Sequence, residues 1–209
     1  MYAIHKHHSL PLTVAMMLML LLTICAVCSP ARASGDGTMG NPWQITSVTE
    51  LQELAESVNS GNARAGEYFL LTADLDLSGV CGANLNGQEV GWTPIGCAGD
   101  ITFCGVFDGA GHTVSNLYIC EGENYRGLFG TVSGTVKNLN VTGNVLASAT
   151  FDSYIGGVAG ASYGAVESCT FSGKVSGRNY VGGVVGICNG ALNYCVNSGA
   201  VTGETKSAV

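Results

Sequence analysis

The sequence predicts an all-β fold, a parallel β-helix (β-solenoid) with one capping α-helix at its N-terminal end. Three features predict it: a repeat in the C-terminal part, apolar–polar alternation inside each copy, and glycines every few residues. Residues 127–130, 157–160 and 183–186 read GLFG, GVAG and GVVG, at offsets of 30 and 26 residues. Such a period is typical of a solenoid, in which each unit buries its apolar face against the next.

The register set by these glycines continues along each copy. Cys169 and Phe171 alternate with polar residues as strand positions do, and helical repeats would not tolerate so many glycines at about 1 kcal/mol each. An antiparallel sandwich is the alternative, although its strands are not expected to repeat at matched positions. The solenoid predicts stacked columns of equivalent residues: Val136, Val166 and Leu192; Leu139, Cys169 and Cys195; Gly143, Gly173 and Gly199; Val145, Val175 and Val201; Tyr125, Tyr154 and Tyr180.

The same motifs resemble the GLUG repeats of exported bacterial proteins. The resemblance is carried by GLFG at 127–130 and GGVVG at 182–186, each followed by a glycine turn and an Asn/Cys strand such as residues 193–195. Residues 103–117 and 71–77 resemble the segment that precedes such repeats, so the likeness extends from about Asn41 to the C-terminus. The family includes surface proteins, adhesin-like chains and the non-catalytic part of certain IgA-cleaving metallopeptidases.

Residues 1–33 are predicted to be a signal peptide. Lys6 lies in the n-region, residues 12–27 form an apolar run, and residues 31–33 read ARA, which predicts cleavage after Ala33. The apolar run is shorter than the roughly 20 residues that span a bilayer, but an uncleaved anchor stays open. Cys25 and Cys28 belong to this leader, and the bulky Val27 disfavours lipoprotein processing at Cys28.

The charge of the mature chain excludes two classes of partner. Removing the leader takes away Lys6 and Arg32 and no acid, so the net charge falls from −7 to −9. Nucleic acid and anionic lipid surfaces should repel such a chain. We therefore expect no nucleic-acid partner and no stable membrane insertion after signal cleavage.

Residues 34–66 are predicted to hold a lead-in strand and the capping helix. Residues 42–45 read as the strand, and Ser47 with Glu50 forms a capping box. Apolar residues follow at helical spacing, and Gly61 lies where a helix would end. The helix should cover the open end of the first coil, because that end exposes apolar side chains and unpaired strand edges. The apolar stripe consists of Leu51, Leu54, Ala55 and Val58.

Residues 67–124 are predicted to form the first β-helix coils, with Leu71, Ala73, Leu75 and Leu77 on one face and Trp92 packed in a turn. Asp74, Asp76 and Asp108 could bind calcium or act as a carboxylate pair. The alternative is that Asp74 and Asp76 keep an edge soluble and Asp108 makes an Asx turn before Gly109.

No catalytic, cofactor-binding or metal-binding residue is predicted, and no cofactor. His112, which should complete the turn after Gly111, is the one histidine of the mature chain, so a two-histidine zinc site cannot form. No G-x-S-x-G elbow or phosphate loop occurs.

Seven cysteines follow the leader, and export permits disulfides. Cys169 and Cys195 hold the same repeat position and are expected to be free, stacked thiols. Better candidates for bridges are Cys81, Cys97, Cys104 and Cys120.

Residues 125–209 are the GLUG-type repeats. Ala208 and Val209 fall where Tyr180 and Val181 fall one repeat earlier, so we expect a C-terminal truncation and an N-terminal piece of a longer gene product.

The expected function is that of a non-enzymatic exported scaffold, a secreted or cell-surface stalk or adhesin-like module that contacts glycan or protein through surface loops. Residues 146–152 form an insertion, and we expect binding residues to collect in this loop. The alternatives are an accessory region of a larger secreted peptidase and a glycan-cleaving β-helix enzyme. The repeats contain few charged residues that could serve a glycan-cleaving enzyme: Arg126, Lys137, Lys174, Arg178, Asp152 and Glu167.

Overall fold

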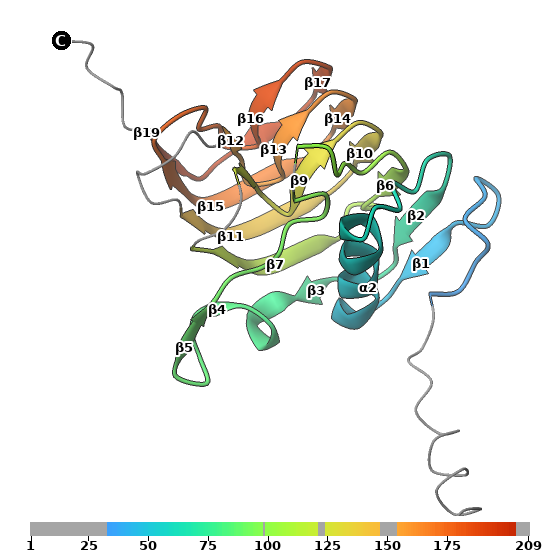
Figure 1. The fold of residues 1–209 in the computed structure, drawn as a ribbon, viewed down its shortest axis with the longest axis horizontal. Helices are drawn as coiled ribbons and strands as arrows, with labels where there is room; N and C mark the ends of the chain where they lie inside the picture. Colours follow the sequence, from blue (N-terminus) through green and yellow to red (C-terminus); the bar gives the residue numbers. More distant parts are fainter. Residues whose placement is uncertain (1–32, 98, 121–123, 147–153, 204–209) are drawn as a thin grey trace, which may run out of the picture. The chain divides into compact units, whose positions relative to one another are not determined.

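The chain folds into a parallel β-solenoid with one α-helix near its N-terminal end, as the sequence predicts (Figure 1). The structure is a computed structural model that describes residues 33–97, 99–120, 124–146 and 154–203. From Ala33 onward the chain forms one compact unit. The predicted signal peptide, apart from Ala33, and the last six residues lie outside the described part.

Three parallel sheets form the sides of the solenoid, and the later coils contribute to all three in turn. In the first sheet every strand pairs with the equivalent strand of the next coil. Its strands, in spatial order, are β1 (Trp43–Ile45), β2 (Tyr68–Leu71), β6 (Val106–Asp108), β10 (Thr135–Lys137), β14 (Ala165–Glu167) and β17 (Ala191–Asn193).

The second and third sheets follow the same order of coils. The second contains β3 (Leu75–Asp76), β7 (Thr113–Ile119), β11 (Asn140–Leu146) and β15 (Thr170–Gly177), with β18 (Val196–Asn197) and β19 (Ala200–Gly203) both pairing with β15. The third contains β9 (Phe129–Val132), β13 (Ala159–Ser162) and β16 (Val185–Cys188). Two shorter strands, β8 (Tyr125–Arg126) and β12 (Tyr154–Ile155), pair beside the third sheet.

The strand register confirms two of the predicted columns in full, that of Val136, Val166 and Leu192 and that of Val145, Val175 and Val201. Val136 pairs with Val166, and Val166 pairs with Leu192. The column also runs back to Phe107 and Phe69 in the earlier coils, where the sequence repeat is weak. Equivalent residues therefore lie on top of one another, and each coil buries the apolar face of its neighbour.

The helix α2 (Val48–Asn59) begins and ends as the sequence predicts. The Ser47 side chain accepts a hydrogen bond from the Glu50 amide, and the Glu50 carboxylate accepts one from the Ser47 amide at 3.0 Å. This reciprocal capping box satisfies two amides that the first turn leaves free. The chain leaves the helix through Gly61, at φ 97°. The predicted stripe is buried: Leu51, Leu54, Ala55 and Val58.

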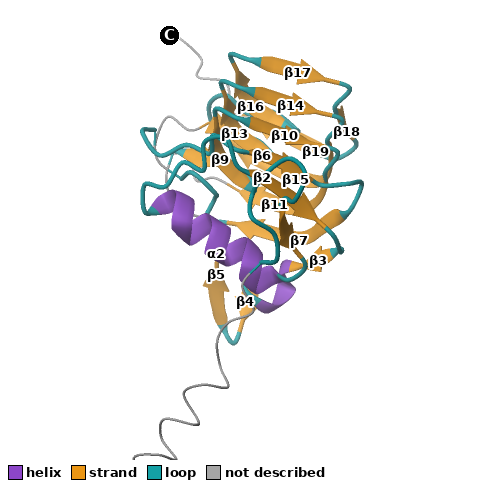
Figure 2. Cartoon of the chain, turned by 90° about the vertical axis from the view of Figure 1, so that its right-hand side faces the viewer, coloured by secondary structure: helices purple, strands orange, loops and turns teal. Residues whose placement is uncertain are grey.

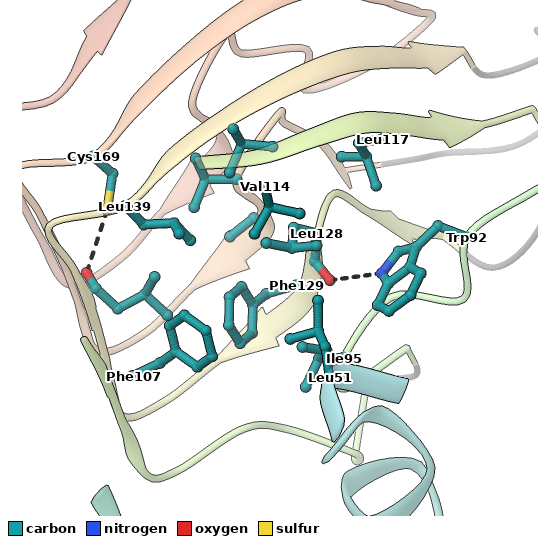
Figure 3. Close-up of a cluster of buried hydrophobic side chains, with 14 of the residues drawn as sticks. Leu51, Trp92, Ile95, Phe107, Val114, Leu117, Leu128, Phe129, Leu139 and Cys169 are labelled. Carbon is teal, nitrogen blue, oxygen red and sulfur yellow. Dashed lines mark hydrogen bonds between the residues drawn. The ribbon is translucent and has the colours of Figure 1, made fainter. Parts of the chain in front are cut away.

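The place of α2 in the chain explains how it caps the solenoid. It lies between β1 and β2, where later coils place strands of the second and third sheets. Figure 2 shows α2 at the end of the stack opposite β17. Figure 3 shows Leu51 beside Ile95 and Phe129 at the start of the third sheet. Among the residues that the structure describes, no helix is long and apolar enough to cross a membrane.

Aromatic side chains fill the interior of the first coils (Figure 3). The ring centroid of Phe129 lies 5.4 Å from that of Phe103 and 5.4 Å from that of Phe107. Trp92 is buried, as predicted, and its Nε1 donates to the carbonyl oxygen of Leu128 at 3.1 Å. The indole thereby ties an irregular segment to the first GLFG motif.

A hairpin of β4 (Gly82–Leu85) and β5 (Gln88–Val90), absent from the sequence prediction, follows a short 3₁₀ helix, Leu77–Gly79. The hydroxyl of Tyr118 donates to Glu89, which fastens the hairpin to β7 of the second sheet.

The first glycine of the GVAG motif is required by a close approach. A Cβ atom on Gly157 would lie 2.0 Å from Cδ2 of Phe171, a fully buried side chain of β15. No real Cβ contact is that short, so either Phe171 or the backbone would have to move. The repeat thus keeps glycine here because the motif packs directly against the core of its own coil.

Gly157→Ala is expected to lower the free energy of unfolding by about 1–3 kcal/mol, the usual cost of overpacking a core. Gly40→Ala is the matched control: its Cβ would meet nothing within 4 Å, so we expect a change within about 0.5 kcal/mol. Urea unfolding measures both. Equal effects of the two substitutions would contradict the packing argument.

Candidate functional site

The acids singled out in the sequence gather at one corner of the solenoid, where the chain turns from the first sheet into the second. We call this set the polar corner. Asp74, His112 and Asn138 come from the turns before or after strands of the two sheets and Asp108 is the last residue of β6, whereas Asp76 and Asn116 lie beside them in β3 and β7 of the second sheet. It consists of Asp74, Asp76, Asp108, His112, Asn116 and Asn138.

Asp74 joins two coils. Its Oδ1 lies 3.1 Å from Nδ1 of His112 and accepts a hydrogen bond from the Thr113 amide at 2.8 Å. Both contacts lower the pKa of Asp74, and the hydrogen bond from the Thr113 amide has the larger effect. His112 also completes the turn after Gly111, as predicted, because its amide donates to the carbonyl of Gly109 at 2.8 Å.

Asp76 caps the short 3₁₀ helix. Its Oδ1 accepts from the Nδ2 of Asn116 at 2.8 Å and from the Ser78 amide at 2.9 Å. These hydrogen bonds, that of Asn116 being the larger effect, lower the pKa of Asp76. Asn116 has a left-handed backbone, φ 57°, at an irregularity in the pairing of β7 with β11.

Asp108 forms the predicted Asx turn, since its Oδ1 accepts from the Ala110 amide at 2.9 Å. The same oxygen accepts from Nδ2 of Asn138 in the next coil at 3.0 Å, and Lys137 Nζ lies 3.2 Å from Oδ2. Burial raises the pKa of Asp108, but the contacts of Asn138, Ala110 and Lys137 together outweigh it and leave the pKa lowered.

The polar corner therefore has the geometry of a structural ladder. Each of its three carboxylates accepts hydrogen bonds from the protein, and the shift in pKa is downward in all three. A general acid needs the opposite shift, toward neutrality. In the described part of the chain no three His, Cys, Asp or Glu side chains lie close enough to hold a metal ion.

The cysteines differ in part from the prediction. None of those that the structure describes forms a disulfide, so the bridges predicted among the four earlier cysteines are wrong. The thiols of Cys81 and Cys104 lie instead near the carbonyl oxygens of Asn116 and Thr102, at 3.6 and 4.0 Å. Cys169 and Cys195 are free, as predicted. Burial raises the pKa of Cys169 to about 12, so this thiol stays protonated.

The tyrosines that open the repeats form an aromatic stack. The ring centroids of Tyr125 and Tyr154 are 5.0 Å apart with planes at 16°, and those of Tyr154 and Tyr180 are 4.8 Å apart at 27°. Each pair of rings covers the faces that lie between them, so Tyr154, in the middle of the stack, offers only its edge and hydroxyl. Of the predicted insertion loop only Leu146 is described; residues 147–152 lie outside the described part.

A cavity of about 510 Å³ lies between α2 and residues 91–93, and no sequence pattern indicates it. Gln52, Glu56 and Trp92 are among its lining residues, which include no lysine or arginine. Asn59 fixes the cavity wall, because its Nδ2 donates to the Pro94 carbonyl at 3.0 Å and its Oδ1 accepts from the Gly96 amide at 2.8 Å.

Comparison with known proteins finds two relatives. The chain is 36% identical over 148 residues to Halomucin from Haloquadratum walsbyi, a match that covers 69% of this chain and 2% of Halomucin. It is 30% identical over 139 residues to a "Gly-rich membrane protein" from Evansella cellulosilytica, covering 65% of this chain and 15% of that protein. This chain therefore spans only a small part of either relative. No protein-family model and no solved structure matches it.

One of these names refers to a mucin and the other to a membrane protein. The chain is thus similar to surface- or membrane-associated proteins, and its solenoid fold fits a scaffold.

The contacts of Asp108 with Asn138, Ala110 and Lys137 predict a pH-dependent stability. A carboxyl whose pKa is lowered by folding stabilises the fold above its unfolded pKa, and this contribution is lost as the pH falls through the folded pKa. Asp108→Asn keeps the turn acceptor and removes the charge. We expect a loss of about 0.5–1 kcal/mol at about pH 7 and little loss at about pH 2.5.

Urea unfolding at the two pH values measures this difference. Glu56→Gln, an equal loss of charge on an exposed helical residue, is the control and should leave the pH profile of the parent unchanged. An Asp108→Asn loss of the same size at both pH values would show that the charge plays no part.

Proposed function

We propose that the chain is a non-enzymatic, exported scaffold module of the cell surface, a stalk or adhesin-like segment built from GLUG-type repeats. The observation that carries the proposal is the unbroken first sheet, in which strands from β1 to β17 pair in register. Each interior strand of this sheet is paired on both sides. Such stacking makes a stiff body whose surface can vary while its core does not.

The lowered pKa values of the acids in the polar corner support a scaffold rather than a hydrolase. Cleavage of a glycosidic bond usually requires two carboxyl groups, one of which is held protonated by a raised pKa. The carboxylates of the polar corner are instead occupied by amide, asparagine and lysine donors, and their pKa values are lowered. Their role in this proposal is to join coils.

The partners in this proposal are glycans or proteins that contact the surface loops. Loops on a regular scaffold tolerate variation without loss of the core, which is why binding residues collect there. The predicted leader and the names of the two relatives support a secreted or cell-surface location. The net charge of −7 disfavours nucleic acid, and the proposal includes no cofactor.

The absence of enzymatic activity is tested on the chain from Ser34 onward. We expect binding on a glycan array and no release of reducing ends from the bound glycans, because no carboxyl of the polar corner can act as an acid near neutral pH. The same chain unfolded by heat gives the background. Release of reducing ends above that background would overturn the non-enzymatic proposal.

The location is tested with the full chain carrying a tag after Val209. Protease added to intact cells should remove most of the tag, because an exported segment lies outside the membrane. A matched chain without residues 1–33 should keep its tag inside the cells. Equal protection of the tag in the two chains would contradict export.

A further inference from the structure

The cavity between α2 and residues 91–93 combines buried apolar residues with exposed polar ones. Two of its lining residues, Ala55 and Trp92, are only 5% and 6% exposed, and we call them the apolar floor. Its volume of about 510 Å³ falls within the range of small-molecule sites, roughly 300–1,000 Å³. The polar lining residues are half-buried or exposed, and we call them the polar rim: Gln52, Glu56, Asn59, Ser60 and Thr93.

Hydrogen bonds hold both sides of the cavity in place. On the loop side, Nε1 of Trp92 donates to the Leu128 carbonyl at 3.1 Å (Figure 3). On the helix side, Oδ1 of Asn59, the last residue of α2, accepts from the Gly96 and Cys97 amides at 2.8 and 3.1 Å. The helix and the loop are therefore joined directly. A site that is formed before its ligand arrives loses less conformational entropy on binding.

The cavity is built from segments outside the repeats. One side is α2, and the other comes from the two ends of the β4–β5 hairpin, with Val80 before the hairpin and residues 91–93 after it. Stacking fixes the residues of the columns but does not fix those of this lining. Binding surfaces on a regular scaffold are typically built from such segments.

The chemistry of the polar rim matches that of a sugar. The Gln52 amide and the hydroxyls of Ser60 and Thr93 both donate and accept hydrogen bonds, and the Glu56 carboxylate accepts them. A sugar ring has hydroxyl groups along its edge and apolar C–H groups on its faces, so it can meet the polar rim and the apolar floor together. The Glu56 carboxylate and the net charge of −7 oppose an acidic sugar.

We propose that this cavity binds one neutral sugar unit of a glycan. A face of the ring packs on the apolar floor, and the hydroxyls exchange hydrogen bonds with the polar rim. The ligand is bound and released unchanged. The inference rests on the proposed function, in which glycans are among the partners, and it names the place and the class of sugar.

Titration of the chain from Ser34 onward with the methyl glycosides of glucose, galactose and mannose, followed by heteronuclear NMR, tests the site. We expect at least one of them to bind with a Kd of about 1 mM, the order of magnitude for so small a ligand. Its binding should shift the amide signals of α2 and of residues 91–93. The matching methyl uronide should bind at least about threefold more weakly, because Glu56 repels its carboxylate.

Substitutions of Gln52 test the cavity itself. Gln52→Trp places a bulky side chain in the cavity and should weaken binding at least about tenfold. Gln52→Ala removes one amide, and the loss of its hydrogen bonds should weaken binding about three- to tenfold. Gln88→Trp and Gln88→Ala make the same changes at an exposed residue of β5 that does not line the cavity, so they should bind as the parent does.

Thermal unfolding confirms that each variant is folded before its affinity is compared. Weaker binding by the folded Gln52 variants, with the Gln88 variants equal to the parent, supports the site. Tighter binding of the uronide, or a Gln52→Trp variant that binds with the parent's affinity, would overturn the site and leave glycans as partners elsewhere on the chain. If none of the three glycosides binds at up to about 50 mM, the site is overturned, and the glycan array then decides separately whether glycans remain in the proposed function.

Discussion

In-register stacking of coils is the constraint on which the rest of the structure depends. A single coil cannot bury its apolar residues or satisfy its backbone groups, so each coil is stable only against its neighbours. The spacing between coils is that of adjacent strands, which leaves little space where strands cross a corner or pack against the core. Gly143 and Gly173 show the result: they pair directly, at φ 147° and 145°, and a Cβ on Gly173 would lie 1.9 Å from the Gly143 carbonyl oxygen.

The same constraint decides what the polar side chains do. At the corner between the first two sheets, an Asp of one coil faces the turn of the next, where amides and side-chain donors are within hydrogen-bonding distance. Asp74 meets Thr113, and Asp108 meets Asn138. A carboxylate held by such donors is stabilised in its charged form, which suits a structural tie and opposes use as a proton donor. The surface chemistry of the corner therefore follows from the stacking of the core.

The sequence predicts most of the stacked part because equal residues recur at equal offsets. The contact of Asp108 with Asn138, 30 residues apart, lies at the same offset as the first two repeats and could have been found by extending the register backward. The contact of Asp74 with His112, 38 residues apart, could not, because insertions in the early coils destroy the offset. One insertion is the hairpin β4–β5, whose turn residues Asn86 and Gly87 are a dipeptide typical of such turns. The cavity beside Trp92 depends on a helix and a distant loop, and no local pattern reports it.

The first coil shows how the chain closes one end of the stack. At the first coil the chain replaces two sheet positions by α2, whose capping box and buried stripe can form before any strand pairs, since both are local. This end is therefore closed by residues that are adjacent in sequence to the coil they cover.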